Sequence, residues 1–179
     1  AKAFGDYSNP IIDYWYGADP WAMEYNGRVY VYGTNDSQQY EAAANADNNY
    51  SKIKSLNCYS SADMVNWTDH GTIAVSGNKG AAKWSANSLA PAVCHKKING
   101  KEKFFLYFAN NASSIGVLTA DSPTGPWTDP IGKPIIDRSI TGCAESEIGW
   151  LFDPAVLVDD DGTGYLYFGG IGNTDGKKE

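Results

Sequence analysis

Hydrophobic and polar residues alternate in four short segments of this 179-residue chain, and glycine, asparagine or aspartate flanks each of them. The segments are residues 28–32, 104–108, 116–119 and 164–168. Alternation with a period of two is typical of a strand with one buried face, and the flanking residues favour tight turns. Almost all of the secondary-structure signal is therefore β, and the pattern predicts an all-β protein.

Three of these segments belong to hairpins that repeat one pattern. Each hairpin has a strand that begins around a proline, then a turn, then a second strand rich in apolar and aromatic residues. A tight turn is expected in each hairpin, because Asn-Gly and Asp-Gly are the strongest short hairpin signals. The turn dipeptides are Asn26-Gly27, Asn99-Gly100 and Asp161-Gly162.

The residues before the three prolines fix the length of the repeat. They are Asp19, Ala90 and Asp153, spaced about 71 and 63 residues apart along the chain. Hairpins repeated at this distance are typical of the blades of a β-propeller. The scaffold repeats, but only the first and third copies carry a carboxylate before the proline.

The chain is short for a closed ring. It holds about two and a half repeats, whereas a propeller typically needs at least four blades. Residues 173–179 are polar and contain no further blade. We therefore expect residues 1–179 to form one portion of a single propeller domain, with the remaining blades supplied by a companion polypeptide. Residues 38–49, rich in Ala and Asn, predict a long loop or a marginal helical turn on one face.

Composition excludes two classes of partner. The formal net charge is −7 and the pI is about 4.7, with no basic cluster. Nucleic acids and anionic membranes require concentrated Lys and Arg, so neither is an expected partner. No apolar run approaches the length of a membrane span. The three cysteines lack zinc-ligand spacing and leave open either one disulfide or three free thiols.

Asp19 and Asp153 are the candidate chemical groups. Because proline favours an extended conformation in the residue before it, we expect both to stand extended at the start of an inner strand. Inner strands line the central channel of a propeller, so the two carboxylates would converge on its axis. Such a pair suits acid–base chemistry on a sugar. In the alternative interpretation, Asp-Pro is a strand-entrance turn whose side chains only cap the backbone.

The ordered set of motifs resembles glycoside hydrolase family 43. The resemblance runs from residue 9 to residue 170 and rests on several short motifs at blade spacing. These are Asn9-Pro10-Ile11-Ile12 with Ala18-Asp19-Pro20, Trp84 with Ala90-Pro91, and Phe152-Asp153-Pro154-Ala155-Val156 with Asp159-Asp160-Asp161-Gly162. It implies a five-bladed β-propeller, of which this chain supplies the N-terminal portion. It also implies an inverting hydrolase of arabinose- or xylose-containing polysaccharides.

Carried over to this sequence, the resemblance assigns two roles. Asp19 matches the general base that activates the attacking water, and Asp153 matches the aspartate that orients the substrate and adjusts the pKa of the acid. The family's general acid is a glutamate some tens of residues beyond the second aspartate, and no matching motif is present here. Glu145 and Glu147 precede Asp153 and do not match it. We expect the acid to lie on the missing blades.

Aromatic residues cluster around the repeated motifs, and rings stack on the flat faces of sugars. Trp15 and Trp84 are candidates for sugar binding, with packing between blades as the equal alternative. Asn87 and Ser88 are candidate hydrogen-bond donors to sugar hydroxyls. For Trp67 and Trp127 we expect packing in the core.

The leading functional hypothesis is a secreted α-L-arabinofuranosidase or β-xylosidase acting on hemicellulose such as arabinoxylan. The alternatives are an endo-arabinanase, which needs an open groove, and a propeller that binds carbohydrate without catalysis. No cofactor is required and no metal-binding cluster is predicted. A structural calcium ion in the propeller channel is compatible with the sequence.

Overall fold

A computed structural model describes residues 10–42 and 50–170. In this part of the chain nine strands and one short helix form. They are β1 (Ala18–Tyr25), β2 (Arg28–Thr34), α1 (Ser37–Ala42), β3 (Ser55–Ser61), β4 (Thr68–Ala74), β5 (Leu89–Ile98), β6 (Lys101–Asn110), β7 (Ser114–Ala120), β8 (Phe152–Val158) and β9 (Gly164–Gly169).

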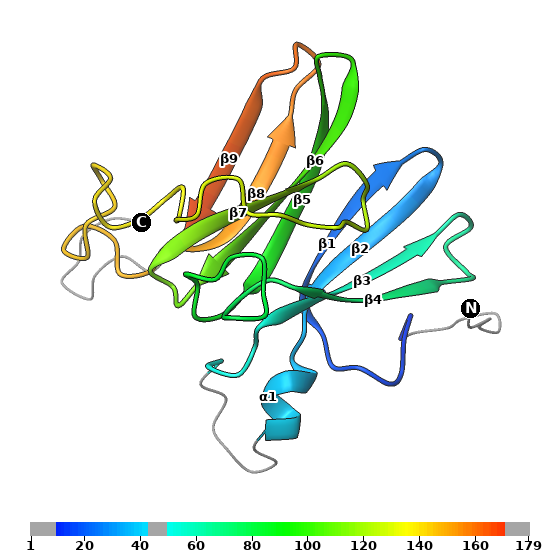
Figure 1. Ribbon diagram of the computed structural model, residues 1–179, viewed down its shortest axis with the longest axis horizontal. Helices are drawn as coiled ribbons and strands as arrows, with labels where there is room; N and C mark the ends of the chain where they lie inside the picture. Colours follow the sequence, from blue (N-terminus) through cyan, green and yellow to red (C-terminus); the bar gives the residue numbers. More distant parts are fainter. Residues whose placement is uncertain (1–9, 43–49, 171–179) are drawn as a thin grey trace.

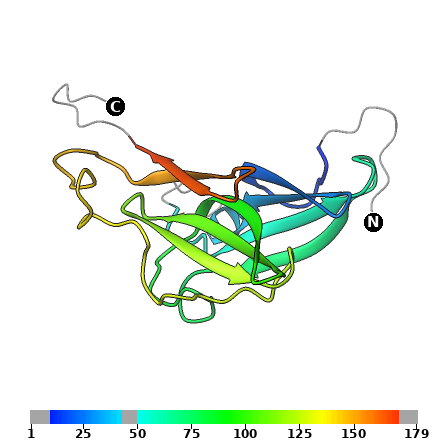
Figure 2. The same cartoon turned by 90° about the horizontal axis from the view of Figure 1, so that it is seen from above.

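The strands form three antiparallel sheets, which fan out side by side (Figures 1 and 2). We call them blade 1 (β1–β4), blade 2 (β5–β7) and blade 3 (β8 and β9). The first strand of blade 2, β5, contacts both β1 and β8, so the three first strands are neighbours along the inner side. The all-β propeller-type fold and the estimate of about two and a half blades are therefore confirmed.

Blade 2 carries the beginning of a fourth strand. Beyond β7, Thr128 pairs with Thr119 through reciprocal backbone hydrogen bonds of 2.8 and 2.9 Å. Blade 1 thus has all four strands, blade 2 three and a short extension, and blade 3 its first two.

Two of the three predicted hairpin turns are confirmed. Asn26-Gly27 and Asn99-Gly100 each have both residues at positive φ, as a two-residue turn with the twist of a hairpin requires. The third hairpin also forms around Asp161-Gly162, but its connection is longer than the expected tight turn, because β8 and β9 are separated by residues 159–163. There the backbone N–H of Gly162 bonds to Asp159 O and that of Asp159 bonds to Thr163 O, which closes a longer loop.

The segment predicted as a loop or marginal helical turn contains α1. Its predicted range extends to Asn49, and residues 43–49 lie outside the described residues, as does the polar tail at 173–179. Helix α1, at the beginning of this segment, projects from the end of blade 1 (Figure 1).

The main hydrophobic core lies between blades 1 and 2. Tyr32 and Leu56 from blade 1 meet Phe104 and Phe108 of blade 2, and all four are at 0% exposure. A smaller cluster around Leu89 and Ile115 joins blade 2 to blade 3.

Of the two tryptophans expected to pack in the core, one is buried and the other is partly buried against the main core. Trp67 is buried, and the ring of Trp127, in the segment after β7, packs edge-on against Tyr32 across the blade interface. The three cysteines are free thiols, which answers the question that their spacing left open.

Hydrogen bonds cross the same interfaces. The indole of Trp21 donates to Val93 O over 2.8 Å, and the Tyr32 hydroxyl donates to Pro123 O over 2.7 Å. The amine of Lys96 donates to Gly162 O, which links blade 2 to the hairpin loop of blade 3. Apolar packing and these polar contacts together hold the blades in register.

Arg138 organises the long connection between blades 2 and 3. Its guanidinium donates four hydrogen bonds to backbone oxygens, at 3.3, 2.6, 3.1 and 2.7 Å. The acceptors are Cys143, Ile148, Ala112 and Gly149, respectively. A planar fork with five donors suits such a set of carbonyls. This residue fixes the path by which the chain reaches β8.

We expect Arg138→Ala to lower the free energy of unfolding by about 2–3 kcal/mol, because hydrogen bonds from a charged group are lost and carbonyls are left without donors. Urea unfolding followed by circular dichroism measures the change. Arg28→Ala is the matched control, since Arg28 donates to a single hydroxyl, that of Ser60. Equal losses from the two substitutions would contradict the assigned role of Arg138.

Candidate active site

The first strand of every blade is interrupted at the same place. The pairing register shifts between Ala18 and Trp21 in β1, between Leu89 and Ala92 in β5, and between Phe152 and Ala155 in β8. Each shift leaves one extra residue on the inner strand, which is a β-bulge. Bulges of this kind re-aim side chains, and they recur here at the aspartate or alanine before the proline.

The backbone at these positions is left-handed. Asp19, Ala90 and Asp153 have φ of 49°, 44° and 47°. The expectation of an extended conformation before proline is therefore wrong. The local preference is overridden because the inner strand must accommodate an extra residue beside its partner strand. A non-glycine residue held in this region costs about 1–3 kcal/mol and is found mainly at functional sites.

Thr34 connects two of the three bulges. Its hydroxyl, 1% exposed at the end of β2, accepts a hydrogen bond from the backbone N–H of Ala90 over 2.8 Å. The same hydroxyl donates to Asp19 Oδ2 over 3.2 Å. The carboxylate on blade 1 is thereby placed beside the bulge of blade 2.

The negative charge of Asp19 affects two other carboxyl groups. Burial raises the pKa of Asp153, and the negative charge of Asp19 raises it further. The same two causes, in the same order, raise the pKa of Asp36, which precedes α1. The sequence analysis missed Asp36 and Thr34 because both lie at the far end of the hairpin, where only strand pairing brings them back to Asp19. The predicted aspartates therefore interact across blades.

The described contacts of Trp84 are with residues of blade 2 and not with Asp19, Asp36 or Asp153. Its ring stacks on Phe108 with 6.0 Å between ring centroids, and its indole N–H donates to Asp129 Oδ2 over 2.7 Å. A side chain on Gly116 would collide with Phe108 and touch Trp84, so the ring fills the space beside β7. These contacts favour a packing role for Trp84 over sugar stacking, but the ring packs on blade 2, whereas the alternative left open by the sequence was packing between blades.

The two predicted polar ligands are buried. Asn87, 2% exposed, exchanges two hydrogen bonds with Asn111, at 2.9 and 2.7 Å. Ser88 is 0% exposed, and its hydroxyl has no partner in the described part of the chain. Their burial favours a structural role over direct contact with a sugar. Trp15 is half-buried against Tyr14 in the segment before β1 and is still a candidate for sugar stacking.

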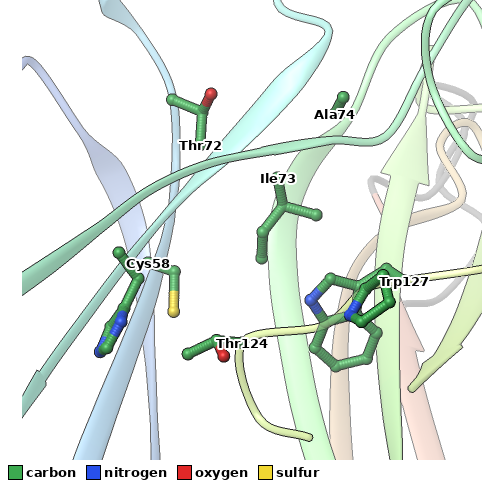
Figure 3. A pocket seen from close by; sticks show the side chains of 8 residues that line it. Cys58, Thr72, Ile73, Ala74, Thr124 and Trp127 are labelled. Carbon is green, nitrogen blue, oxygen red and sulfur yellow. The ribbon is translucent and has the colours of Figure 1, made fainter. Parts of the chain in front are cut away.

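A cavity of about 250 Å³ lies elsewhere, between β4 and the segment after β7 (Figure 3). Its lining includes Cys58, Thr72, Thr124 and Trp127, and it contains none of the predicted site residues. Burial raises the pKa of the Cys58 thiol to about 12, so this thiol is protonated at neutral pH. The lining contains no carboxylate, so the cavity lacks the acid–base groups on which inverting glycoside hydrolysis depends.

Within residues 10–42 and 50–170, no group of three or more His, Cys, Asp or Glu side chains is placed to hold a metal ion. No helix in the same ranges is long and apolar enough to cross a membrane.

The described part of the chain is thus a set of propeller blades in which two equivalent inner-strand bulges carry aspartates. The family model of glycosyl hydrolases family 43 matches residues 7–179. The chain therefore belongs to glycosyl hydrolase family 43, which confirms the resemblance recognised from the short motifs.

Individual relatives narrow the comparison. The chain is 58% identical over 177 residues to an arabinoxylan arabinofuranohydrolase of Bacillus subtilis, covering 95% of this chain and 34% of the relative. It is 56% identical over 170 residues to the enzyme of the same name from Paenibacillus polymyxa, covering 91% and 26%. The chain thus spans about a third or less of the length of these relatives.

Solved structures agree with the fold. The B. subtilis family 43 arabinoxylan arabinofuranohydrolase, determined with cellotetraose, superposes with a TM-score of 0.83 at 53% identity, over 95% of this chain and 36% of that one. An α-L-arabinofuranosidase from Clostridium thermocellum gives a TM-score of 0.64 at 38% identity, over 91% and 50%.

We expect Asp19→Asn to lower the pKa of Asp153, because the substitution removes a neighbouring negative charge and leaves the Asp153 carboxyl in its place. The pKa should remain above its ordinary value, since burial is the larger cause of the rise. Carboxyl ¹³C shifts followed through a pH titration measure this change. An unaltered Asp153 titration would show that the two groups do not interact.

The same substitution should stabilise the fold at neutral pH by at most about 1 kcal/mol, because water screens these partly exposed carboxylates. A carboxyl whose pKa is raised by folding destabilises the fold as pH rises above its unfolded pKa, and Asp19→Asn reduces that penalty. The gain should vanish below about pH 4, where Asp153 and Asp36 bind protons in both states. Thermal unfolding of the wild type and of Asp19→Asn at pH 7 and at pH 3 measures the gain in stability and its expected loss at low pH.

Proposed function

We propose that this chain forms the N-terminal portion of the catalytic propeller of an inverting glycoside hydrolase that releases α-L-arabinofuranose from arabinoxylan. The observation that carries the proposal is the identity of 56–58% to two arabinoxylan arabinofuranohydrolases over nearly the whole chain. The interacting pair Asp19 and Asp153 supports it, because hydrolysis by inversion depends on carboxyl groups around one sugar.

In this proposal Asp19 is the general base. It takes a proton from water as the water oxygen attacks the anomeric carbon, while a general acid protonates the departing oxygen from the opposite side of the sugar. Asp153 orients the substrate. Its charge, close to that of Asp19, also stabilises the positive charge that develops on the sugar ring in the transition state.

The general acid is proposed to lie on the blades that this chain does not contain. Glu145 and Glu147 are exposed and belong to the connection between blades 2 and 3, before Asp153. An acid and a base that invert a sugar stand roughly 6.5–9.5 Å apart with the substrate between them. The missing blades and a substrate of arabinoxylan type are therefore the proposed partners, and an extracellular location is proposed with them.

Xylose release is the second candidate within the class. A xylosidase/arabinosidase of Humicola insolens is 32% identical over 177 residues, so this scaffold is also related to proteins with xylosidase activity in their names. An endo-arabinanase, or a propeller that only binds carbohydrate, has no comparable relative among those described above. We therefore rank arabinofuranose release first.

We expect Asp19→Ala, in the complete protein that carries this chain, to lower kcat on arabinoxylan by about 10²–10⁴-fold, because the attacking water loses its base. Binding of xylo-oligosaccharides should persist, as measured by calorimetry. Asp121→Ala is the matched control and should keep its activity, because Asp121 is exposed directly after β7 and its carboxylate pairs with Lys103. If the protein only binds sugar, neither the wild type nor either of the two variants would hydrolyse arabinoxylan.

A second prediction concerns the activity of this chain without the proposed general acid. This chain purified alone should release no more pentose from aryl arabinofuranoside or xyloside than buffer does, whereas adding the remaining blades should restore activity. Intact mass and gel analysis must accompany the assay, so that the polypeptides present are known. Full activity from the isolated chain would overturn the proposed location of the acid, and the sugar released would identify the substrate class.

A further inference from the structure

Strand register reveals a difference between the three bulges. In each blade, the residue just before the bulge pairs with one residue at the end of the second strand. These partners are Thr34 in blade 1, Ala109 in blade 2 and Gly169 in blade 3. Only blade 1 therefore has a side-chain hydroxyl opposite its bulge, and blade 1 is the one that carries the proposed general base.

The hydrogen-bond pattern gives that hydroxyl a direction. A threonine hydroxyl has one hydrogen, and here the oxygen already accepts the N–H of Ala90 over 2.8 Å. Its hydrogen is then available to Asp19 Oδ2, 3.2 Å away. The N–H that Thr34 accepts belongs to Ala90, which stands in blade 2 at the position where blades 1 and 3 have a carboxylate.

We propose that Thr34 is a positioning residue for the general base, an inference that rests on the proposed function. By holding Oδ2 of Asp19, it leaves Oδ1 to accept the proton of the attacking water. The water oxygen bonds to the anomeric carbon, the glycosidic C–O bond breaks, and the departing oxygen takes its proton from the general acid. Thr34 touches neither water nor sugar and acts only through Asp19.

Burial makes this arrangement rigid. Thr34 is 1% exposed and lies beside β5, whose position is fixed by the core between blades 1 and 2 and by the bond from Trp21 to Val93. The orientation of Asp19 is thus tied to the packing of the neighbouring blade. In chemistry of this kind a misplacement of about 1 Å costs roughly 100-fold in rate.

The test compares Thr34→Val, Thr34→Ser and Asp19→Ala in the complete protein, with arabinoxylan as substrate. Thr34→Val keeps the shape and removes the hydroxyl, and we expect kcat to fall roughly 10- to 100-fold with KM changed less than about twofold. Thr34→Ser should recover most of kcat, because it keeps the hydroxyl. Thr119→Val, a buried threonine on β7, is the matched control and should leave kcat unchanged.

Thermal unfolding of every variant separates positioning from folding. If Thr34→Val fails to fold, Thr34→Ala, which removes the hydroxyl without adding a methyl group, takes its place with the same expected loss of kcat. Wild-type kcat in a folded variant without the hydroxyl would overturn the inference while leaving the proposed function intact. Wild-type activity of Asp19→Ala would instead overturn the proposed function itself, so the two failures are distinguishable.

Discussion

The structure depends on one backbone device, the left-handed residue in a bulge at the start of each inner strand. Each of these residues precedes a proline, which lacks an N–H and disfavours helical conformations in its predecessor. Asp19, Ala90 and Asp153 nevertheless share φ values within a few degrees of one another. Three strained residues cost several kcal/mol together. Their repetition indicates that the strain is a property of the blade, and the choice of aspartate or alanine then decides what each blade presents to the axis.

Placing carboxylates on this device adds a second cost. Burial raises the pKa of Asp36 and of Asp153, and the negative charge of Asp19 raises each of them further. Like charges held close together destabilise a fold, and such arrangements are retained where activity requires them. A backbone cap needs only one carboxylate per turn, so mutual repulsion across blades favours the chemical interpretation of Asp19 and Asp153 over the capping one.

Much of this could be predicted from the sequence, because a hairpin repeat is a local pattern with long-range regularity. The turns at Asn26-Gly27 and Asn99-Gly100, the blade spacing and the two Asp-Pro positions all come from residues close together in the chain. What the sequence analysis missed depends on pairing across strands. Thr34 and Asp36 meet Asp19 only through the register of β1 and β2, and local preference suggested an extended Asp19 where the bulge requires the opposite sign of φ.

Asp19 and Asp153 lie on sheets that differ in their number of strands and in their packing. Asp19 belongs to a four-stranded blade packed against the main core, whereas Asp153 begins a sheet of two strands, and such a pair has little stability by itself. On that sheet Leu157, Tyr165 and Tyr167 are 52%, 42% and 58% exposed. Apolar side chains gathered in this way mark a surface that packs against another element, which in a propeller is the rest of the blade and its neighbour. Under the proposed function, the blades that carry the general acid would also cover this face and so complete the sheet on which Asp153 lies.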